Sequence, residues 1–136
     1  MVEYTNIEEE DELEKPGDAE LERRMWPTAG KIEFEEVTMR YSSELEPSID
    51  NLSFKAQAGM LIGIVGKSGS GKSSILHALF RLIELENGRI TIDGVDISTV
   101  GLHTLRKSIA YIPKSPFLIQ GTIRENLDPQ EESTDS

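Results

Sequence analysis

The spacing of apolar residues changes along the chain, and each pattern predicts a different element. Residues 31–41 alternate between apolar and polar positions, but the apolar phase shifts at Glu35 and Glu36. This predicts a strand with one buried face and a bulge or bend at the shift. Alternation returns at residues 52–56 and 89–97, and an Asp-Gly pair in the latter stretch indicates a hairpin. We therefore expect an antiparallel β subdomain.

Two continuous apolar runs, residues 61–65 and 108–113, each predict a buried strand. Between them, residues 75–83 place apolar side chains on one helical face, and residues 99–107 predict a second, short helix. Helices between parallel strands form an α/β core. Near the C-terminus, residues 121–129 predict a capped helical turn that ends at an Asp-Pro pair.

The loop that joins the first apolar run to the following helix fits G-x-x-x-x-G-K-[ST] over residues 66–73. Glycines let successive backbone N–H groups converge on an anion, and they place no Cβ in its way. The helix that begins near Gly71 adds its unpaired N–H groups and the positive end of its dipole. The alternative is a glycine-rich surface turn, which the flanking strand and helix patterns disfavour. The loop therefore predicts a nucleotide-phosphate site.

Each polar residue of the loop has a predicted role toward ATP and Mg²⁺, the expected cofactors. Lys72, the one predicted catalytic residue, reaches the β- and γ-phosphates, and the Ser73 hydroxyl ligates the metal. Ser74 contacts the α-phosphate. The predicted phosphate-binding residues are Gly66, Lys67, Ser68, Gly69, Ser70, Gly71, Lys72, Ser73 and Ser74.

Acidic residues are concentrated at the N-terminus. Residues 1–22 carry ten acidic side chains and one lysine, so most of the net charge of −11 lies there. A charge block of this kind is typical of a disordered segment. The expected organisation is a disordered acidic leader and linker at 1–25, a domain at 26–130 and a polar tail at 131–136.

Composition argues against several other classes of function. There is no basic stripe for nucleic acid and no cysteine for disulfides. The longest apolar run, residues 60–65, is far below the ~20 residues that a bilayer requires, so we expect no membrane insertion by this chain. His77 and His103 lack partners at metal-ligand spacing, and Asp93 and Asp96 fit turn and cap roles better than a metal pair.

With these elements placed, the chain resembles the N-terminal part of the nucleotide-binding domain of ATP-binding cassette (ABC) transporters. It is most similar to the second such domain of subfamily C, the multidrug-resistance-associated group. The matching stretches are residues 26–34, 37–41, 66–74, 88–94, 112–113 and 121–129. The phosphate loop alone indicates only a P-loop NTPase, whereas the other stretches give the resemblance its specificity.

The resemblance implies a P-loop NTPase core, with an incomplete parallel sheet and helices, beside the antiparallel β subdomain. It also bears on Tyr41, which from the sequence is either the last core-facing residue of its strand or a flat face for adenine. The family implies adenine stacking. It further implies ATP-driven transport of a solute at the cytoplasmic face of a membrane, with transmembrane domains and a second nucleotide-binding domain as partners.

The chain departs from the family pattern in two ways. Lys114 stands where the family has a glutamine, and an ammonium group offers Mg²⁺ no acceptor. Either Lys114 ion-pairs with the γ-phosphate or the position has lost its role. The family's signature motif, metal-binding Asp and catalytic Glu are absent from the sequence, so we expect ATP binding without turnover by this chain. The alternatives are a non-enzymatic nucleotide-binding or interaction fragment, and a soluble ABC ATPase without membrane domains, which the transporter-like residues 26–34 disfavour.

Overall fold

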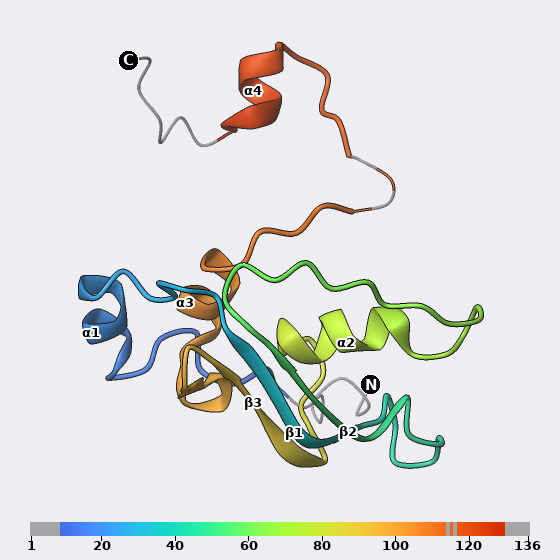
Figure 1. Cartoon of the computed structure of the whole chain (residues 1–136). Helices are drawn as coiled ribbons and strands as arrows, with labels where there is room; N and C mark the ends of the chain where they lie inside the picture. Colours follow the sequence, from blue (N-terminus) through green and yellow to red (C-terminus); the bar gives the residue numbers. More distant parts are fainter. Residues whose placement is uncertain (1–8, 114, 116, 130–136) are drawn as a thin grey trace, which may run out of the picture.

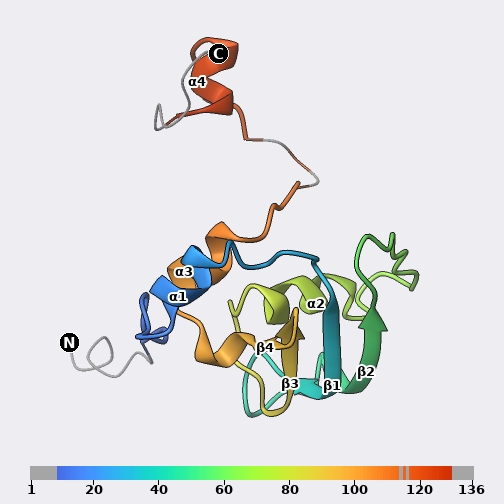
Figure 2. The same ribbon diagram turned by 60° about the vertical axis from the view of Figure 1, so that its left-hand side comes forward.

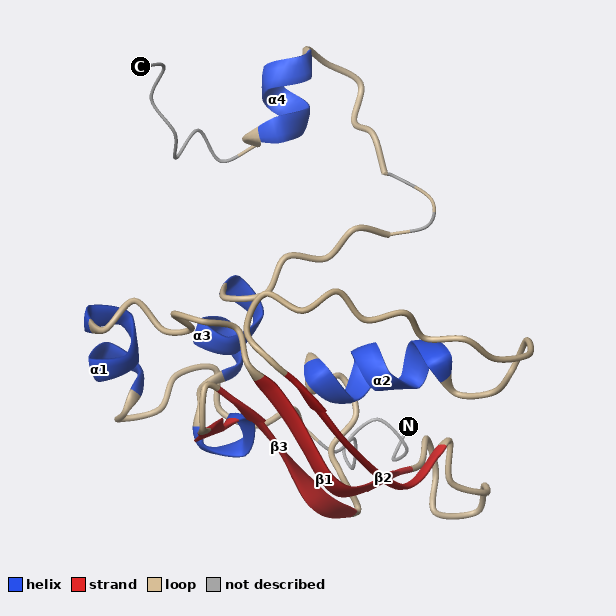
Figure 3. Cartoon of the chain, viewed as in Figure 1, coloured by secondary structure: helices blue, strands red, loops and turns tan. Residues whose placement is uncertain are grey.

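The computed structural model describes residues 9–113, residue 115 and residues 117–129. Its centre is a four-stranded antiparallel sheet in the order β2-β1-β3-β4 (Figures 1 and 3). The strands are β1 (Ile32–Met39), β2 (Ile49–Ala56), β3 (Asn87–Ile92) and β4 (Val95–Asp96). The helices are α1 (Asp18–Arg23), α2 (Lys72–Leu79), the 3-10 turn η2 (Ile97–Thr99), α3 (Leu102–Lys107) and α4 (Ile123–Leu127).

Strand β1 lies between β2 and β3, and Phe34 faces Phe54 on one side and Ile90 on the other. The register shifts after Phe34, where Glu36 takes a positive φ of 49°. The predicted bulge is therefore confirmed. It lets the strand change which residues face the core, because one extra residue reverses the alternation.

The core forms where helix α2 and the segment through α3 pack on the sheet. Phe34 and Ile90 from the strands meet Ala78 from α2 and Leu105 from α3 in one apolar cluster. Burial of a Phe or Ile side chain contributes roughly 1.5–3 kcal/mol. The helix that follows the phosphate loop is thereby fixed to the antiparallel sheet.

The two predicted parallel strands, residues 61–65 and 108–113, are not strands in the structure. Both segments are largely exposed, with Leu61 at 99%, Val65 at 97% and Ile112 at 91%. A strand requires backbone partners, and no strand among the described residues pairs with either segment. The described residues therefore form a mixed α/β structure whose sheet is antiparallel, and the expected incomplete parallel sheet is not formed.

The acidic leader also differs from the expectation of disorder over its described part, residues 9–25. It contains helix α1, which lies beside α3 in Figure 2, and Asp18 at the start of α1 is 7% exposed. The backbone N–H groups of Leu102 and His103 donate to the carbonyls of Glu12 and Leu13. Charged residues form ordered structure here because they find ionic and backbone partners in the domain.

The expected hairpin joins β3 to β4 through Asp93 and Gly94, both with positive φ. The Asp93 carboxylate accepts hydrogen bonds from the four backbone N–H groups of residues 28–31, at 2.7–3.1 Å. Burial opposes ionisation of Asp93, but these four donors hold its pKa below the usual value. Trp26 Nε1 donates to the carbonyl of Ile92 at 3.0 Å. Asp93 thus acts in the turn, as predicted, and also fixes the linker.

Helix α4 is the capped helical turn that residues 121–129 predict, and its cap is a capping box. The Thr122 side chain accepts from the Glu125 N–H, and Glu125 accepts from the Thr122 N–H in return. In both views α4 lies away from the sheet. Among the described helices, none has the length and apolar content needed to cross a bilayer.

Candidate phosphate-binding site

The phosphate loop turns tightly into helix α2 through two glycines in left-handed conformations. Gly69 and Gly71 have φ of 79° and 81°, and Gly71 is the N-cap of α2. A Cβ on Gly71 would overlap the carbonyl oxygen of Ser48, in the connection between β1 and β2. Only glycine fits there, for conformation and for space. The loop is therefore held against the antiparallel sheet at the point where the helix begins.

Lys72 folds back over the loop. Its Nζ donates to the carbonyl of Gly66 at 2.7 Å, to the carbonyl of Lys67, and to Ser70 Oγ at 3.4 Å. A Cβ on Gly66 would overlap the Ser70 hydroxyl and touch the Lys72 side chain. The ammonium group thus lies at the centre of the loop, where a phosphate could replace the carbonyls as its partner.

The two serines that follow Lys72 have different surroundings. Ser73 is exposed in the first turn of α2 and lines a cavity of about 500 Å³. Ser74 is buried, and its hydroxyl lies 3.0 Å from the hydroxyl of Tyr41. Ser73 therefore offers an accessible oxygen ligand for a hard cation. The Ser74 hydroxyl links the helix to the segment after β1, and its contact with a phosphate stays a prediction.

Tyr41 lies beside α2, close to the predicted loop residues. Its hydroxyl is 2.7 Å from His77 Nδ1, and the two rings meet edge to face with centroids 5.9 Å apart. Tyr41 remains 44% exposed, so it is not the buried end of its strand. The structure thus brings Tyr41 to the helix that carries Ser73 and Ser74.

His77 is the residue of this site that the sequence analysis missed. Because it has no partner at metal-ligand spacing, its sequence context indicates no role in a site. The available signal was its spacing from Ser74, since residues three apart lie on the same face of a helix. The cavity beside Ser73 is lined mainly by apolar and aromatic side chains. These are Leu76, His77, Phe80, Leu82, Tyr111 and Ile112.

These residues fit the predicted cofactors in type and place. The loop supplies glycines, a lysine and a helix N-terminus for phosphates, and the Ser73 hydroxyl suits Mg²⁺. Among the described residues, no group of three or more His, Cys, Asp or Glu side chains is placed so that it could hold a metal ion. Lys114, the predicted departure from the family, lies outside the described residues.

A glycine-rich turn at a helix N-terminus, with a lysine folded over it, defines a P-loop nucleotide-binding domain. Residues 49–136 match the family described as ABC transporter. The chain belongs to the ABC transporter family, as its resemblance predicted, and membership implies that it binds ATP.

Individual relatives agree with this assignment. The chain is 53% identical over 131 residues to the ABC-type transporter cicA of Emericella nidulans, covering 96% of this chain and 9% of the relative. It is 45% identical over 126 residues to ABC transporter C family member 2 of Dictyostelium discoideum, covering 93% of this chain and 9% of the relative. It is 48% identical over 137 residues to the ABC transporter ATP-binding protein/permease VMR1 of Saccharomyces cerevisiae, covering 97% of this chain and 8% of the relative. The predicted similarity to subfamily C is confirmed, and the chain spans less than a tenth of these curated relatives.

Proposed function

We propose that the chain binds MgATP at residues 66–74 and forms part of a transporter in which ATP binding and hydrolysis drive a solute across a membrane. The observation that carries the proposal is the position of Lys72. This residue begins α2, and its Nζ lies 2.7 Å from the Gly66 carbonyl oxygen, over the loop. There the ammonium charge, the loop N–H groups and the helix dipole act on the same small volume.

In this proposal each residue acts on a different part of the nucleotide. Lys72 neutralises the β- and γ-phosphates, and the exposed Ser73 hydroxyl ligates Mg²⁺. The ring of Tyr41, half-exposed beside α2, stacks on adenine. The phosphate-binding residues remain Gly66, Lys67, Ser68, Gly69, Ser70, Gly71, Lys72, Ser73 and Ser74.

Hydrolysis requires more than these residues. Phosphoryl transfer depends on placing water and neutralising charge at the γ-phosphate, and after residue 113 the sequence carries no apolar run that ends in adjacent acidic residues. We propose that this chain binds ATP without turnover. Turnover and transport then require transmembrane domains and a second nucleotide-binding domain, at the cytoplasmic face of a membrane.

Nucleotide titration of the full chain tests the proposal. Lys72→Met should weaken MgATP binding roughly 10- to 100-fold, because it removes charge-assisted hydrogen bonds to phosphate. Lys107→Met is the matched control, since Lys107 is an exposed lysine on α3, away from the loop. Ser73→Ala should reduce the gain in affinity that Mg²⁺ gives. Equal affinities for Lys72→Met and the control would contradict the proposed site.

A further inference from the structure

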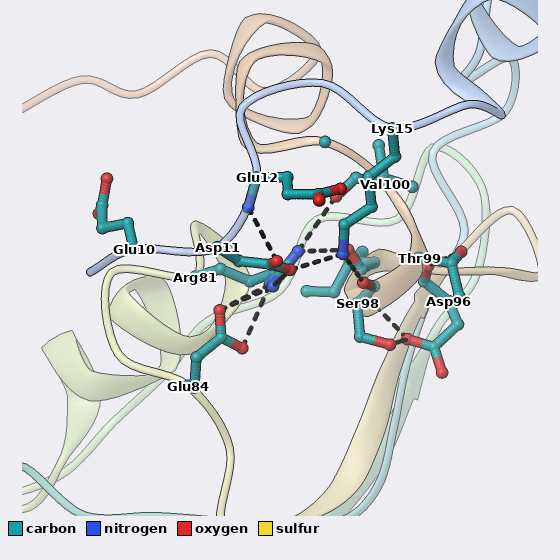
Figure 4. Close-up of polar contacts among 12 residues, drawn as sticks. Glu10, Asp11, Glu12, Lys15, Arg81, Glu84, Asp96, Ser98, Thr99 and Val100 are labelled. Atoms are coloured by element: carbon teal, nitrogen blue, oxygen red, sulfur yellow. Dashed lines mark hydrogen bonds and ion pairs between the residues drawn. The ribbon is translucent and has the colours of Figure 1, made fainter. Parts of the chain in front are cut away.

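The acidic leader is bound to two arginines at the far end of the phosphate-loop helix. Figure 4 shows Asp11 between Arg81 and Lys15, with Oδ2 2.6 Å from Arg81 Nη2 and 2.5 Å from Lys15 Nζ. These two cations, Lys15 first, hold the pKa of Asp11 far below its usual value. We refer to residues 10–18 as the strap.

Arg81 is an almost fully buried cation. Its side chain is 5% exposed, and Nη1 donates to the carbonyls of Ile97 and Val100 at 3.1 Å each. Its charge is balanced by Glu84 at 2.7 Å and by Asp11 of the strap. A buried guanidinium that loses one of its carboxylates is left with uncompensated charge. The strap therefore supplies half of the ionic partners of Arg81.

Arg106 connects the strap directly to helix α2. Its guanidinium binds both carboxylate oxygens of Glu10, at 2.8 and 3.1 Å. It also donates to the carbonyls of Phe80 and Arg81, at 3.1 and 3.0 Å. Phe80 is the C-cap of α2, and terminal carbonyls of a helix lack partners within it. A cation at this end also complements the helix dipole.

Backbone contacts hold the strap in register independently of its outer charges. Asp18 accepts from the N–H of Gly101 at 3.0 Å and from the N–H of Lys15 at 2.9 Å. A Cβ on Gly101 would overlap Asp18 and the backbone of the strap. The strap and the start of α3 therefore meet in one close-fitting arrangement.

We propose that the strap positions the C-terminal end of α2 through Arg81 and Arg106, so that nucleotide affinity at the other end of the helix depends on strap docking. Helix α2 has only 8 residues, about 12 Å in length, and helices this short are not stable alone. Both ends need tertiary support. Glu10 and Asp11 are positioning residues here, and the nucleotide part of the inference rests on the proposed function.

Hydrogen exchange on the full chain tests the positioning. The reporters are the amides of Phe80, Arg81 and Leu82, which donate to carbonyls within α2. Glu10→Gln combined with Asp11→Asn should speed their exchange about tenfold or more, because hydrogen bonds to charged partners are lost. The matched control is Glu14→Gln combined with Glu22→Gln, which removes the same charge from exposed leader positions. Equal exchange in the two double variants would overturn the inference.

Salt provides a readout that simple loss of packing would not produce. Raising NaCl from about 0.1 M to about 1 M shortens the Debye length from about 10 Å to about 3 Å. Exchange at residues 80–82 should accelerate with salt in the unsubstituted chain and in the control, but much less after Glu10→Gln and Asp11→Asn. Salt-independent exchange in the unsubstituted chain would contradict a role for the more exposed Glu10–Arg106 pair, because buried pairs such as Asp11–Arg81 are screened much less.

MgATP titration of the same variants tests the coupling. Glu10→Gln with Asp11→Asn should weaken MgATP binding roughly three- to tenfold relative to the control. The loss is moderate because the broken ion pairs lie at the opposite end of α2 from the phosphate loop. Unchanged affinity in a chain that binds MgATP would overturn the coupling. Failure of the unsubstituted chain to bind MgATP would instead contradict the proposed function, and hydrogen exchange would still decide whether the strap positions α2.

Discussion

The hydroxyl of Tyr41 lies 2.7 Å from Nδ1 of His77, which joins the residue predicted to stack on adenine to the helix predicted to hold phosphates. The same hydroxyl lies 3.0 Å from Ser74 Oγ. Two α2 side chains, three residues apart, therefore hold one aromatic ring from the segment after β1. The ring has a fixed position before any nucleotide arrives, which reduces the entropy lost on binding.

Removing the hydroxyl while keeping the ring tests this arrangement. Tyr41→Phe retains the stacking surface but loses both hydrogen bonds, so MgATP affinity should fall roughly two- to tenfold. His77→Ala should give a comparable fall, measured by the same titration. The control is His103→Ala, because His103 is an exposed histidine on α3.

Combining the two substitutions distinguishes positioning from direct contact. If His77 acts through the Tyr41 hydroxyl, Tyr41→Phe with His77→Ala should lose little more than either alone. Losses that simply add would show that His77 contributes in some other way.

Local signals predicted the parts of the fold that depend on neighbouring residues. The shift of apolar phase at Glu35 and Glu36 predicted the bulge, and the Asp-Gly pair at residues 93–94 predicted the hairpin. The capped turn predicted over residues 121–129 corresponds to α4. The loop pattern at residues 66–73 predicted the glycine turn into α2. In each case the determining contacts lie within a few residues or between adjacent strands.

The remaining features depend on contacts that sequence patterns do not specify. An apolar run such as residues 61–65 permits a strand, but a strand forms only with hydrogen-bonded neighbours. The acidity of the leader indicated disorder, yet Glu10 pairs with Arg106, 96 residues away. Helical spacing could place His77 near Ser74, but not near Tyr41. Long-range pairing of charges and rings is therefore where the sequence interpretation failed.

Asp93→Asn should destabilise the chain by about 2 kcal/mol. In the unsubstituted chain four backbone N–H groups donate to the Asp93 carboxylate, and the amide of Asn would place its own NH₂ donor against some of them. Chemical denaturation would measure the loss. Asp50→Asn, at an exposed position in β2, is the matched control. A loss no larger than that of the control would contradict a structural role for the Asp93 cradle.

The pKa of Asp93 is lowered in the folded chain, which fixes the sign of its pH effect. Its contribution to stability is fully present above the unfolded-state pKa of about 3.9 and is lost as pH falls through the lower, folded-state value. The stability difference between the unsubstituted chain and Asp93→Asn should therefore be constant from neutral pH to about pH 5 and shrink below about pH 4. Denaturation curves across this range would check it; a difference that grows on acidification would give the opposite sign.

Two glycines with similar φ should respond differently to alanine. Gly94→Ala should cost about 1 kcal/mol, since φ is 79° and open space surrounds the new methyl group. Gly88→Ala should cost roughly 2–4 kcal/mol, because at φ 82° its Cβ would overlap the carbonyl oxygens of Glu35 and Glu36 at the bulge. Thermal unfolding would compare the stabilities of the two variants. Equal losses of stability would mean that the backbone at the bulge can shift to accommodate the new methyl group.

The strap can dock only after a delay during synthesis, because its partners lie far downstream in the sequence. Glu10 precedes Arg106 by 96 residues, and Asp18 precedes Gly101 by 83. At roughly 5–20 residues per second, Glu10 waits about 5 to 20 s on the ribosome for its partner. The strap is thus made well before the residues that fix it, and until then its charge keeps it hydrated. Closure of the strap marks the moment at which the residues up to α3 have all been made.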